Sequence, residues 1–248
     1  MSKKTLYLVD GSTLIFRAYF AIRHLSNSKG LPTNAVYGFT AMLRKLVRDH
    51  APDYLVVVFD KGSQTFRNDI YPDYKANRPP APEDLVPQFG LVRDVTKALN
   101  IASLELAGFE ADDIIATLAA KHEGQFKTVI VSSDKDLMQL VTTDTSMLDT
   151  MKDIQYGPTE VFDKMGVKPS NIIDYLALMG DKVDNIPGVP GIGKKSAAKL
   201  LNSHGSLDGV YAAIEQGDPS IKGKQLENLQ NHRNDAYMSR TLATTKCD

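Results

Sequence analysis

The sequence predicts an α/β fold in which a mainly parallel sheet is flanked by helices, followed by a smaller helical region. Three short apolar runs, rich in β-branched and aromatic residues, have the composition of buried parallel strands. They span Thr5 to Asp10, Tyr54 to Asp60 and Thr128 to Asp134. Stretches with the helical spacing of apolar residues separate them, at 35–49, about 83–99 and 110–122. A chain that alternates strands and helices in this way forms a doubly wound sheet.

Length and composition limit the class of protein. The 248 residues are 42% hydrophobic and 24% charged, enough to bury one sizeable core with a smaller appendage. No uncharged apolar run approaches the ~18 residues that a membrane span needs, and the amino terminus lacks the apolar part of a signal peptide. We therefore expect a cytoplasmic, nucleoid-associated monomer without membrane contact. The single cysteine, Cys247, excludes an internal disulfide and a cysteine-based zinc site.

Charge is unevenly distributed, although the net charge is only −1. Residues 1–50 hold eight Lys or Arg against two Asp or Glu, whereas residues 105–184 hold seven against fifteen. Such blocks of charge are often only solvated surface. The positions of the acids therefore decide whether the acidic block forms a functional site. Asp10, Asp60 and Asp134 end the three predicted strands. The carboxyl ends of parallel strands meet at one edge of a sheet, where α/β proteins place their sites, so these acids should lie together.

Six further acids occur in short motifs. They are Glu110, Asp112 and Asp113 in GFEADDII, Asp136 in SSDKD, and Asp181 and Asp184 in GDKVD. An acid before a helix is often only a cap, but capping needs one acid and not three. Carboxylates packed together repel one another unless cations neutralise them. Oxygen ligands without histidine or cysteine select Mg²⁺, with Mn²⁺ as a substitute, and nine acids exceed the needs of one ion, so two ions are expected.

Several motifs together resemble the 5′-nuclease (flap endonuclease) family. They are VDGSTLIFRAY, VVVFDKGSQTFR, YKANRPPAPEDL, GFEADDIIATL, SSDKDLMQLV and LALMGDKVDNIPGVPGIGKKSA, which cover nearly the whole chain in order. The match is closest to members that form the N-terminal domain of a bacterial DNA polymerase, so linkage to polymerase domains in a longer parent chain is expected. The resemblance implies metal-dependent hydrolysis of DNA phosphodiester bonds at 5′ flaps, nicks or 5′ ends during replication and repair.

The resemblance also implies the architecture and the metal ligands. It places a nuclease core of the PIN type at residues 1–157, with a helical arch at about 61–90, and a helical DNA-binding region at 158–248. All nine acids match the family's acidic positions. By the family pattern, Asp10, Asp60, Glu110, Asp112 and Asp113 serve the first metal, and Asp134, Asp136, Asp181 and Asp184 lie towards the second.

The polar, proline-bearing segment from Lys61 to Pro82 corresponds to the start of the arch. In the family a lysine and an arginine there contact the scissile phosphate, which here implies Lys75 and Arg78. They are less than one helical turn apart, so both face one phosphate if the segment is helical, and paired cations stabilise charge on phosphoryl oxygens. Tyr74 is a candidate for stacking on a displaced base or for packing. Arg67 and Tyr71 are weaker candidates of the same kind.

The glycine-rich segment Ile186 to Leu201 predicts a hairpin that binds DNA backbone. Gly188, Gly191 and Gly193 permit positive φ and close backbone approach, and the helix that follows points its amides at a phosphate. Lys194, Lys195 and Ser196 begin that helix. The resemblance implies a helix-hairpin-helix at about 186–203 and a K⁺ ion held by hairpin carbonyls, which side-chain identity does not test.

Three other functions compete with the nuclease. A non-catalytic DNA-binding module would leave gaps in the acidic set, and none of the nine acids is missing. A phosphatase with an aspartate nucleophile usually needs a second aspartate two residues on, where Ser12 and Gly62 stand. A ribonuclease stays open, because nothing in the sequence reads a 2′-hydroxyl.

Overall fold

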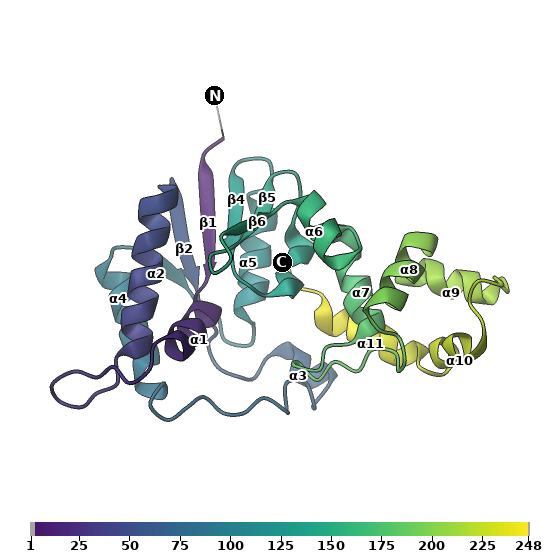
Figure 1. Cartoon of the computed structure of the whole chain (residues 1–248), viewed down its shortest axis with the longest axis horizontal. Coiled ribbons are helices and arrows are strands. Elements are labelled where there is room, and N and C mark those ends of the chain that lie inside the picture. Colours follow the sequence, from purple (N-terminus) through teal and green to yellow (C-terminus); the bar gives the residue numbers. More distant parts are fainter. Residues whose placement is uncertain (1–2, 248) are drawn as a thin grey trace.

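A six-stranded, mostly parallel sheet forms the centre of the computed structural model, which describes residues 3–247. The strand order is β3-β2-β1-β4-β5-β6, and only β6 runs antiparallel to its neighbour. The strands are β1 (Thr5–Asp10), β2 (Tyr54–Val58), β3 (Ala102–Leu104), β4 (Lys127–Val131), β5 (Thr145–Asp149) and β6 (Ile154–Tyr156). The carboxyl ends of the parallel strands therefore share one edge, which points downward in Figure 1.

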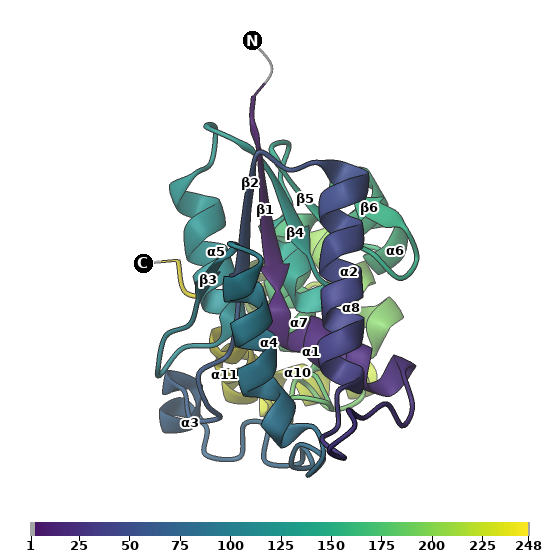
Figure 2. The same cartoon turned by 90° about the vertical axis from the view of Figure 1, so that its left-hand side faces the viewer.

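Helices cover both faces of this sheet (Figures 1 and 2). Alternate residues of β1 face opposite ways: Tyr7 and Val9 pack in one core, whereas Leu6 and Leu8 pack in another. The first core also includes residues of α1 (Gly11–Ala21), α2 (Asn34–His50) and α4 (Val86–Ala98). The second core includes residues of α5 (Ala111–Lys121). Such two-sided burial explains why the strands have almost continuous apolar sequences.

The second core continues without a break into the C-terminal helices. These are α6 (Pro158–Met165), α7 (Ile172–Met179), α8 (Lys194–His204), α9 (Leu207–Glu215), α10 (Gly223–Asn231) and α11 (Arg233–Ala243), with short 3₁₀ turns η1 (Lys135–Leu140) and η2 (Pro169–Asn171). One apolar cluster joins Leu8 and Ile115 to Leu176, Leu201 and Leu229. The helical region is thus fixed to the sheet by shared burial.

The predicted α/β fold is confirmed, and the three predicted strands and three predicted helices are present with small shifts at their ends. Four elements were missed: α1, β3, β5 and β6. The helix α1 begins directly after β1, where Asp10 caps it by accepting a hydrogen bond from the Thr13 amide at 2.9 Å. The strand β3 is only three residues long and its side chains are exposed, so it carries no apolar pattern.

The segment 61–85, which we call the strap, crosses the edge where the strands end (Figure 1). It contains one short helix, α3 (Phe66–Ile70), and otherwise consists of turns and irregular chain. Lys75 has a positive φ of 57°, which no continuous helix permits. The predicted helical arch at about 61–90 is therefore helical only at α3 and at the start of α4. The condition that Lys75 and Arg78 lie on one helix is not met.

The predicted hairpin lies between α7 and α8, and close backbone packing shapes it. Gly188 has a φ of 62°, and a Cβ added there would lie 2.6 Å from the Cα of Gly180. Gly191 also has a positive φ, of 79°. Gly193 differs from the prediction, since it caps α8 with a φ of −97° and has open space around it. Two glycines therefore serve the turn, and the third serves only as a cap.

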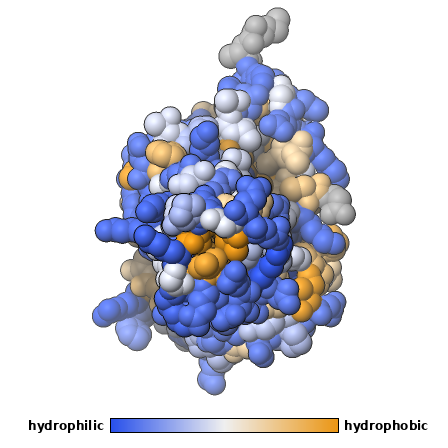
Figure 3. Space-filling view, turned by 90° about the vertical axis from the view of Figure 1, so that its right-hand side faces the viewer, coloured by the Kyte–Doolittle hydropathy of each residue, from blue (hydrophilic) through white to orange (hydrophobic). Residues whose placement is uncertain are grey.

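The surface of the end that carries α8, α9 and α10 is mostly hydrophilic, with a compact hydrophobic area near the centre of the view and further hydrophobic atoms towards its right edge (Figure 3). Among the residues described, no helix is both long and apolar enough to cross a membrane.

We predict that Gly188→Ala destabilises the protein by more than about 2 kcal/mol, because the new methyl group needs space already filled by backbone and a φ that L-residues avoid. Gly193→Ala is the matched control, with an expected loss of less than about 1 kcal/mol, since only a cap preference changes. Urea denaturation of both variants measures the difference. Equal stabilities would contradict the close approach of Gly188 to Gly180.

Candidate active site

A cleft of about 360 Å³ opens at the carboxyl edge of the sheet and gathers acids from separate parts of the chain. Its lining includes Asp10 from β1, Asp60 after β2, and Asp134 after β4. Glu110, the residue before α5, and Asp112 in its first turn complete this set. Five of the nine predicted acids therefore line one cleft, and the three strand-end acids are among them.

Asp10 is the most enclosed of these acids, with 3% of its surface exposed. One carboxylate oxygen accepts from the Thr13 amide and the other from the Ser132 hydroxyl at 2.8 Å. Burial raises the pKa of Asp10 to about 6, and the nearby charge of Asp60 adds to the rise, although the two hydrogen bonds oppose it. The ionised form of this carboxyl is thus held at a cost within the folded protein.

Three more acids have raised pKa values. Burial, followed by the charges of Asp134 and Asp10, raises the pKa of Asp112 well above its usual value. Burial and then the charge of Asp134 do the same for Asp136, whose Oδ1 is buried without a hydrogen-bond partner. The pKa of Asp134 is also raised, by burial first, while the amide of Asp136 bonds its Oδ1 and opposes the rise. The region around Asp112, Asp134 and Asp136 therefore carries negative charge that the neighbouring side chains do not fully neutralise.

Cations from the strap meet the acids across the cleft. The Lys75 ammonium donates to Glu110 Oε1 at 2.6 Å and lies 3.7 Å from Asp184 Oδ2. The Arg78 guanidinium forms an ion pair with Asp184. The amide of Lys75 also donates to the Asp184 carbonyl at 2.9 Å. The two predicted strap cations therefore do face the same point, although turns and not a helix place them there.

Asp181 and Lys135 form a separate pair at the side of the site. The Lys135 ammonium lies 2.6 Å from Asp181 Oδ2, and the Val183 amide donates to Oδ1. Although burial opposes it, the bond from Lys135 lowers the pKa of Asp181. Sequence reasoning missed Lys135, although it stands between two predicted acids in SSDKD. It also missed Ser132, whose hydroxyl bonds Asp10 and accepts from the Asp134 amide.

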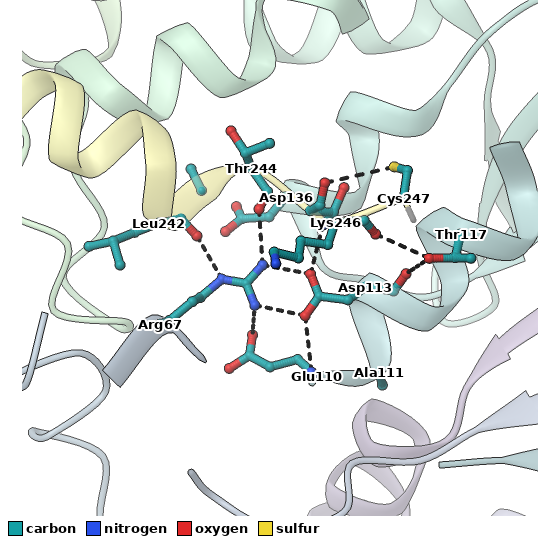
Figure 4. Close-up of polar contacts among 12 residues, drawn as sticks. Arg67, Glu110, Ala111, Asp113, Thr117, Asp136, Leu242, Thr244, Lys246 and Cys247 are labelled. Carbon is teal, nitrogen blue, oxygen red and sulfur yellow. Dashed lines mark hydrogen bonds and ion pairs between the residues drawn. The ribbon is translucent and has the colours of Figure 1, made fainter. Parts of the chain in front are cut away.

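Asp113 and Arg67 do not have the predicted roles (Figure 4). Asp113 is 2% exposed and receives two bonds from the Arg67 guanidinium, each of 2.8 Å. Against the effect of burial, these bonds lower its pKa. Arg67 is itself 2% exposed and so does not present its charge to DNA. The pair is an internal ion pair. Asp112 lines the cleft and Asp113 does not, because successive helical residues face about 100° apart.

Tyr74 is buried, which favours packing over stacking on a base, the two roles that its sequence left open. Its ring packs with Ile186 and Leu242, and Tyr71 is partly buried against them. The Tyr74 hydroxyl donates to Glu110 Oε2 at 3.1 Å. Tyr74 therefore touches the site through its hydroxyl and serves packing with its ring.

The hairpin residues lie apart from the cleft lining. Lys194 and Lys195 are exposed in the first turn of α8, and Ser196 beside them is half-buried. The helix α8 follows the hairpin at the far end from α2 in Figure 1. Two exposed cations at a helix N-terminus, with free amides beside them, are suited to an anionic backbone.

The donor chemistry fits a divalent cation, although the arrangement of side chains is not a finished metal site. Within residues 3–247, no three acid or imidazole side chains are positioned together to hold an ion. The site offers oxygen donors, a buried Oδ1 on Asp136 without a partner among these residues, and acids whose pKa values are raised by burial and then by one another. Those features match a hard cation such as Mg²⁺ or Mn²⁺. Lys75, Arg78 and Lys135 neutralise part of the charge as the structure stands.

Comparison with known families matches both halves of the chain. Residues 5–166 match "5'-3' exonuclease, N-terminal resolvase-like domain", and residues 167–248 match "5'-3' exonuclease, C-terminal SAM fold". The chain belongs to the 5′-3′ exonuclease family. The junction of the two matches falls nine residues after the division predicted at 157/158.

Curated relatives of this exonuclease-family chain have two kinds of name. DNA polymerase I of Rhizobium leguminosarum is 48% identical over 252 residues, which cover 98% of this chain and 24% of that protein. A 5'-3' exonuclease of Aquifex aeolicus is 46% identical over 228 residues, which cover 92% of this chain and 79% of that protein. The chain thus spans about a quarter of the length of the polymerase relatives it matches.

Solved structures share the fold. A T5 5'-exonuclease described with bound divalent zinc ions has a TM-score of 0.78 and 25% identity, covering 97% of this chain and 89% of that one. A T5 flap endonuclease described in a complex with DNA and metal ions has a TM-score of 0.80 and 24% identity, with the same coverage. Together with the family matches, these structures confirm the nuclease-type α/β core and the helical region.

We predict that Asp10→Asn stabilises the protein in a chelator at pH 8. The folded-state pKa of Asp10, about 6, lies above the unfolded value near 3.9, so ionisation costs stability as pH rises through this window. The variant avoids that cost, which amounts to about 3 kcal/mol, and most of the gain should be gone near pH 4, where Asp10 is protonated in the folded state and about half protonated in the unfolded state. Urea denaturation at the two pH values measures it.

The control for this prediction is Asp49→Asn. The exposed Asp49 carboxyl has its pKa lowered to about 2 by Arg48 and Lys45, so its removal should not stabilise the protein at pH 8. A similar gain in both variants would mean that general charge reduction, and not the enclosure of Asp10, is responsible.

Proposed function

We propose that this chain is a divalent-metal-dependent 5′-nuclease that hydrolyses DNA phosphodiester bonds at 5′ flaps, nicks or 5′ ends. The observation that carries the proposal is the cleft in which five acids lie below two strap cations, in a chain of the 5′-3′ exonuclease family. Mg²⁺ is the proposed physiological cofactor, with Mn²⁺ as a substitute, and two ions are proposed. When bound, such ions lower the pKa of water and stabilise charge on the transferring phosphate.

The acids of the chain divide this work by position. Asp10, Asp60, Glu110, Asp112 and Asp134 line the cleft and would hold metal there. Asp136, Asp181 and Asp184 stand at its side, where Asp136 offers an unpartnered oxygen. Burial and then mutual repulsion raise the pKa values of Asp112 and Asp136, and a bound cation would relieve the repulsion.

Lys75 and Arg78 are proposed to bind the phosphate under attack. Both already contact Asp184, and Lys75 contacts Glu110, so they lie at the mouth of the acidic cleft. A phosphodiester that entered there would replace carboxylates as their anionic partner, and the cations would then stabilise charge that develops on its oxygens. A cavity of about 710 Å³ beneath the strap, next to the same cations, is proposed to take the single-stranded 5′ end.

The partner proposed for the hairpin is duplex DNA, contacted through its backbone by Lys194, Lys195 and the amides of the α8 N-terminus. The protein is proposed to act as a monomer. Linkage to polymerase domains is also proposed, because the chain matches only 24% of the length of a DNA polymerase I relative. A K⁺ ion at the hairpin stays a prediction.

The first prediction of this function concerns the metal. Cleavage of a 5′-flap or nicked duplex should require Mg²⁺ or Mn²⁺ and stop in excess chelator. Ca²⁺ should not rescue it, since its looser coordination does not position the attacking water well. Gel assays of a labelled substrate measure the product. Full cleavage in chelator would refute a metal-dependent mechanism.

The second prediction separates chemistry from binding. Arg78→Ala should slow single-turnover cleavage at saturating DNA by ~10²-fold, because one donor to the reacting phosphate is lost. Arg48→Ala is its control, since Arg48 is exposed on α2 and pairs only with neighbouring Asp49. Lys194→Ala with Lys195→Ala should instead weaken duplex binding and reduce the salt slope by up to ~2, at a nearly normal saturated rate.

The opposite pattern would reverse these roles. A normal saturated rate in Arg78→Ala, together with a slow saturated rate in the Lys194 and Lys195 double variant, would make the strap a clamp and the hairpin part of the reaction.

A further inference from the structure

Arg67 is held inside the protein by every nitrogen of its guanidinium group (Figure 4). Nη1 and Nη2 each donate to one oxygen of Asp113 at 2.8 Å. Nη2 also donates to the Thr244 carbonyl at 3.0 Å, and Nε donates to the Leu242 carbonyl at 2.9 Å. Arg67 thus joins α3 in the strap, the first turn of α5, and the carboxyl end of α11.

The carboxyl end of α11 needs such partners, because the last carbonyls of a helix have no amide within the helix. Arg67 satisfies the carbonyls of Leu242 and Thr244, while Gln139 donates to the Ala243 carbonyl at 3.0 Å. A positive group is also favoured there by the helix dipole. The chain after α11 returns to the same pair, since the Lys246 amide donates to Asp113 Oδ1 at 2.9 Å.

Glu110 is the cleft acid that contacts this pair. Its amide donates to Asp113 Oδ2 at 3.0 Å, and its Oε2 lies 3.6 Å from Arg67 Nη1. Its Oε1, on the other side, meets Lys75. The backbone of Glu110 is therefore held by Asp113, and its Oε2 lies against both Arg67 and the Tyr74 hydroxyl, while its Oε1 faces the strap cation at the cleft.

Asp113 is not itself free to hold a cation. Its Oδ1 accepts from Arg67 and from the Lys246 amide, and its Oδ2 accepts from Arg67 and from the Glu110 amide. Four donors fill the acceptor capacity of one carboxylate. The contribution of Asp113 to the site must come through the groups that it bonds.

We propose that Arg67 is a positioning residue for Glu110. Paired with Asp113 and docked on the carboxyl end of α11, it fixes the direction in which Glu110 presents its carboxylate, so metal affinity depends on a pair that touches no metal. The inference rests on the proposed function, in which Glu110 holds metal. Partners that orient a metal ligand typically change affinity by 10- to 100-fold when altered.

The test is a Mn²⁺ titration of the whole chain without DNA, in which electron paramagnetic resonance measures free Mn²⁺. Arg67→Lys should weaken binding by ~10-fold, because an ammonium keeps the charge but cannot form the paired bonds to Asp113. In single-turnover cleavage of a nicked duplex, the half-saturating Mn²⁺ concentration should rise by the same factor. The rate at saturating Mn²⁺ should return to within ~3-fold of the original. Glu110→Gln, which alters the proposed ligand itself, should weaken Mn²⁺ binding at least as much as Arg67→Lys.

Arg240→Lys is the matched control. Arg240 lies on α11 and also makes two ion pairs, with Asp174 at 3.0 Å and Asp208 at 2.9 Å, but it does not line the acidic cleft. It should lower the thermal midpoint and leave Mn²⁺ affinity unchanged. A loss of Mn²⁺ affinity in this control equal to that in Arg67→Lys would overturn the proposal, because general loosening of α11 would then explain both.

A second variant separates positioning from loss of folding. Arg67→Met with Asp113→Leu removes both buried charges at similar volume, so neither charge is left unpaired. The Leu242 and Thr244 carbonyls lose a donor in it, so its thermal midpoint is measured beside its Mn²⁺ affinity. The double variant should show the same loss of Mn²⁺ affinity as Arg67→Lys. Unchanged affinity in both folded variants would refute the proposal. If the unaltered chain binds Mn²⁺ but cleaves no DNA, the proposed function fails, and the titration alone still decides the role of Arg67.

Discussion

Repulsion among acids enclosed at one edge of the sheet is the constraint on which the rest of the site depends. Asp10, Asp112 and Asp136 are too well enclosed for water to screen their charges fully, and burial raises the pKa of each. The protein limits this cost by bringing cations from elsewhere: Lys75 and Arg78 from the strap, and Lys135 from the turn after β4. The strap crosses the strand ends, and this path places its two cations beside the enclosed acids.

The same constraint sorts the acids into two kinds. Asp113 and Asp181 each have a dedicated cation, and their pKa values are lowered. Asp10 and Asp112 have no such cation within residues 3–247, and burial raises their pKa values. A carboxylate with its own permanent cation gains little from a metal ion, whereas an uncompensated one gains much. The assignment of Asp113 to structure and of its neighbour Asp112 to the metal site follows from this difference in partners.

The sequence alone predicted the strands and the strand-end acids, because both depend on a local pattern of residues. The run from Thr5 to Asp10 is apolar because both faces of β1 are buried, and its final aspartate must lie at the common edge of the sheet. The sequence did not predict the role of a side chain whose hydrogen-bond partners are distant in the chain. Arg67 has the composition of a surface loop cation, but its partners are Asp113, 46 residues away, and the Leu242 carbonyl, 175 residues away. Neither spacing nor residue type contains that information.

The strap has buried anchors at both ends and at Tyr74, and exposed contacts on the stretch that follows Lys75, which suits an exchange of partners. Arg67 anchors one end in the interior, and Gln88 of α4 fixes the other by accepting from the Ala35 amide and donating to the Asp84 carbonyl. Beyond Tyr74, the exposed Asn77 side chain donates to the Lys182 carbonyl, and Arg78 holds Asp184 from a partly exposed position. Contacts of this exposed kind contribute little stability. Lys75 and Arg78 can therefore move from carboxylate to phosphate while the buried anchors keep the strap over the cleft, so the exchange needs no disruption of the core.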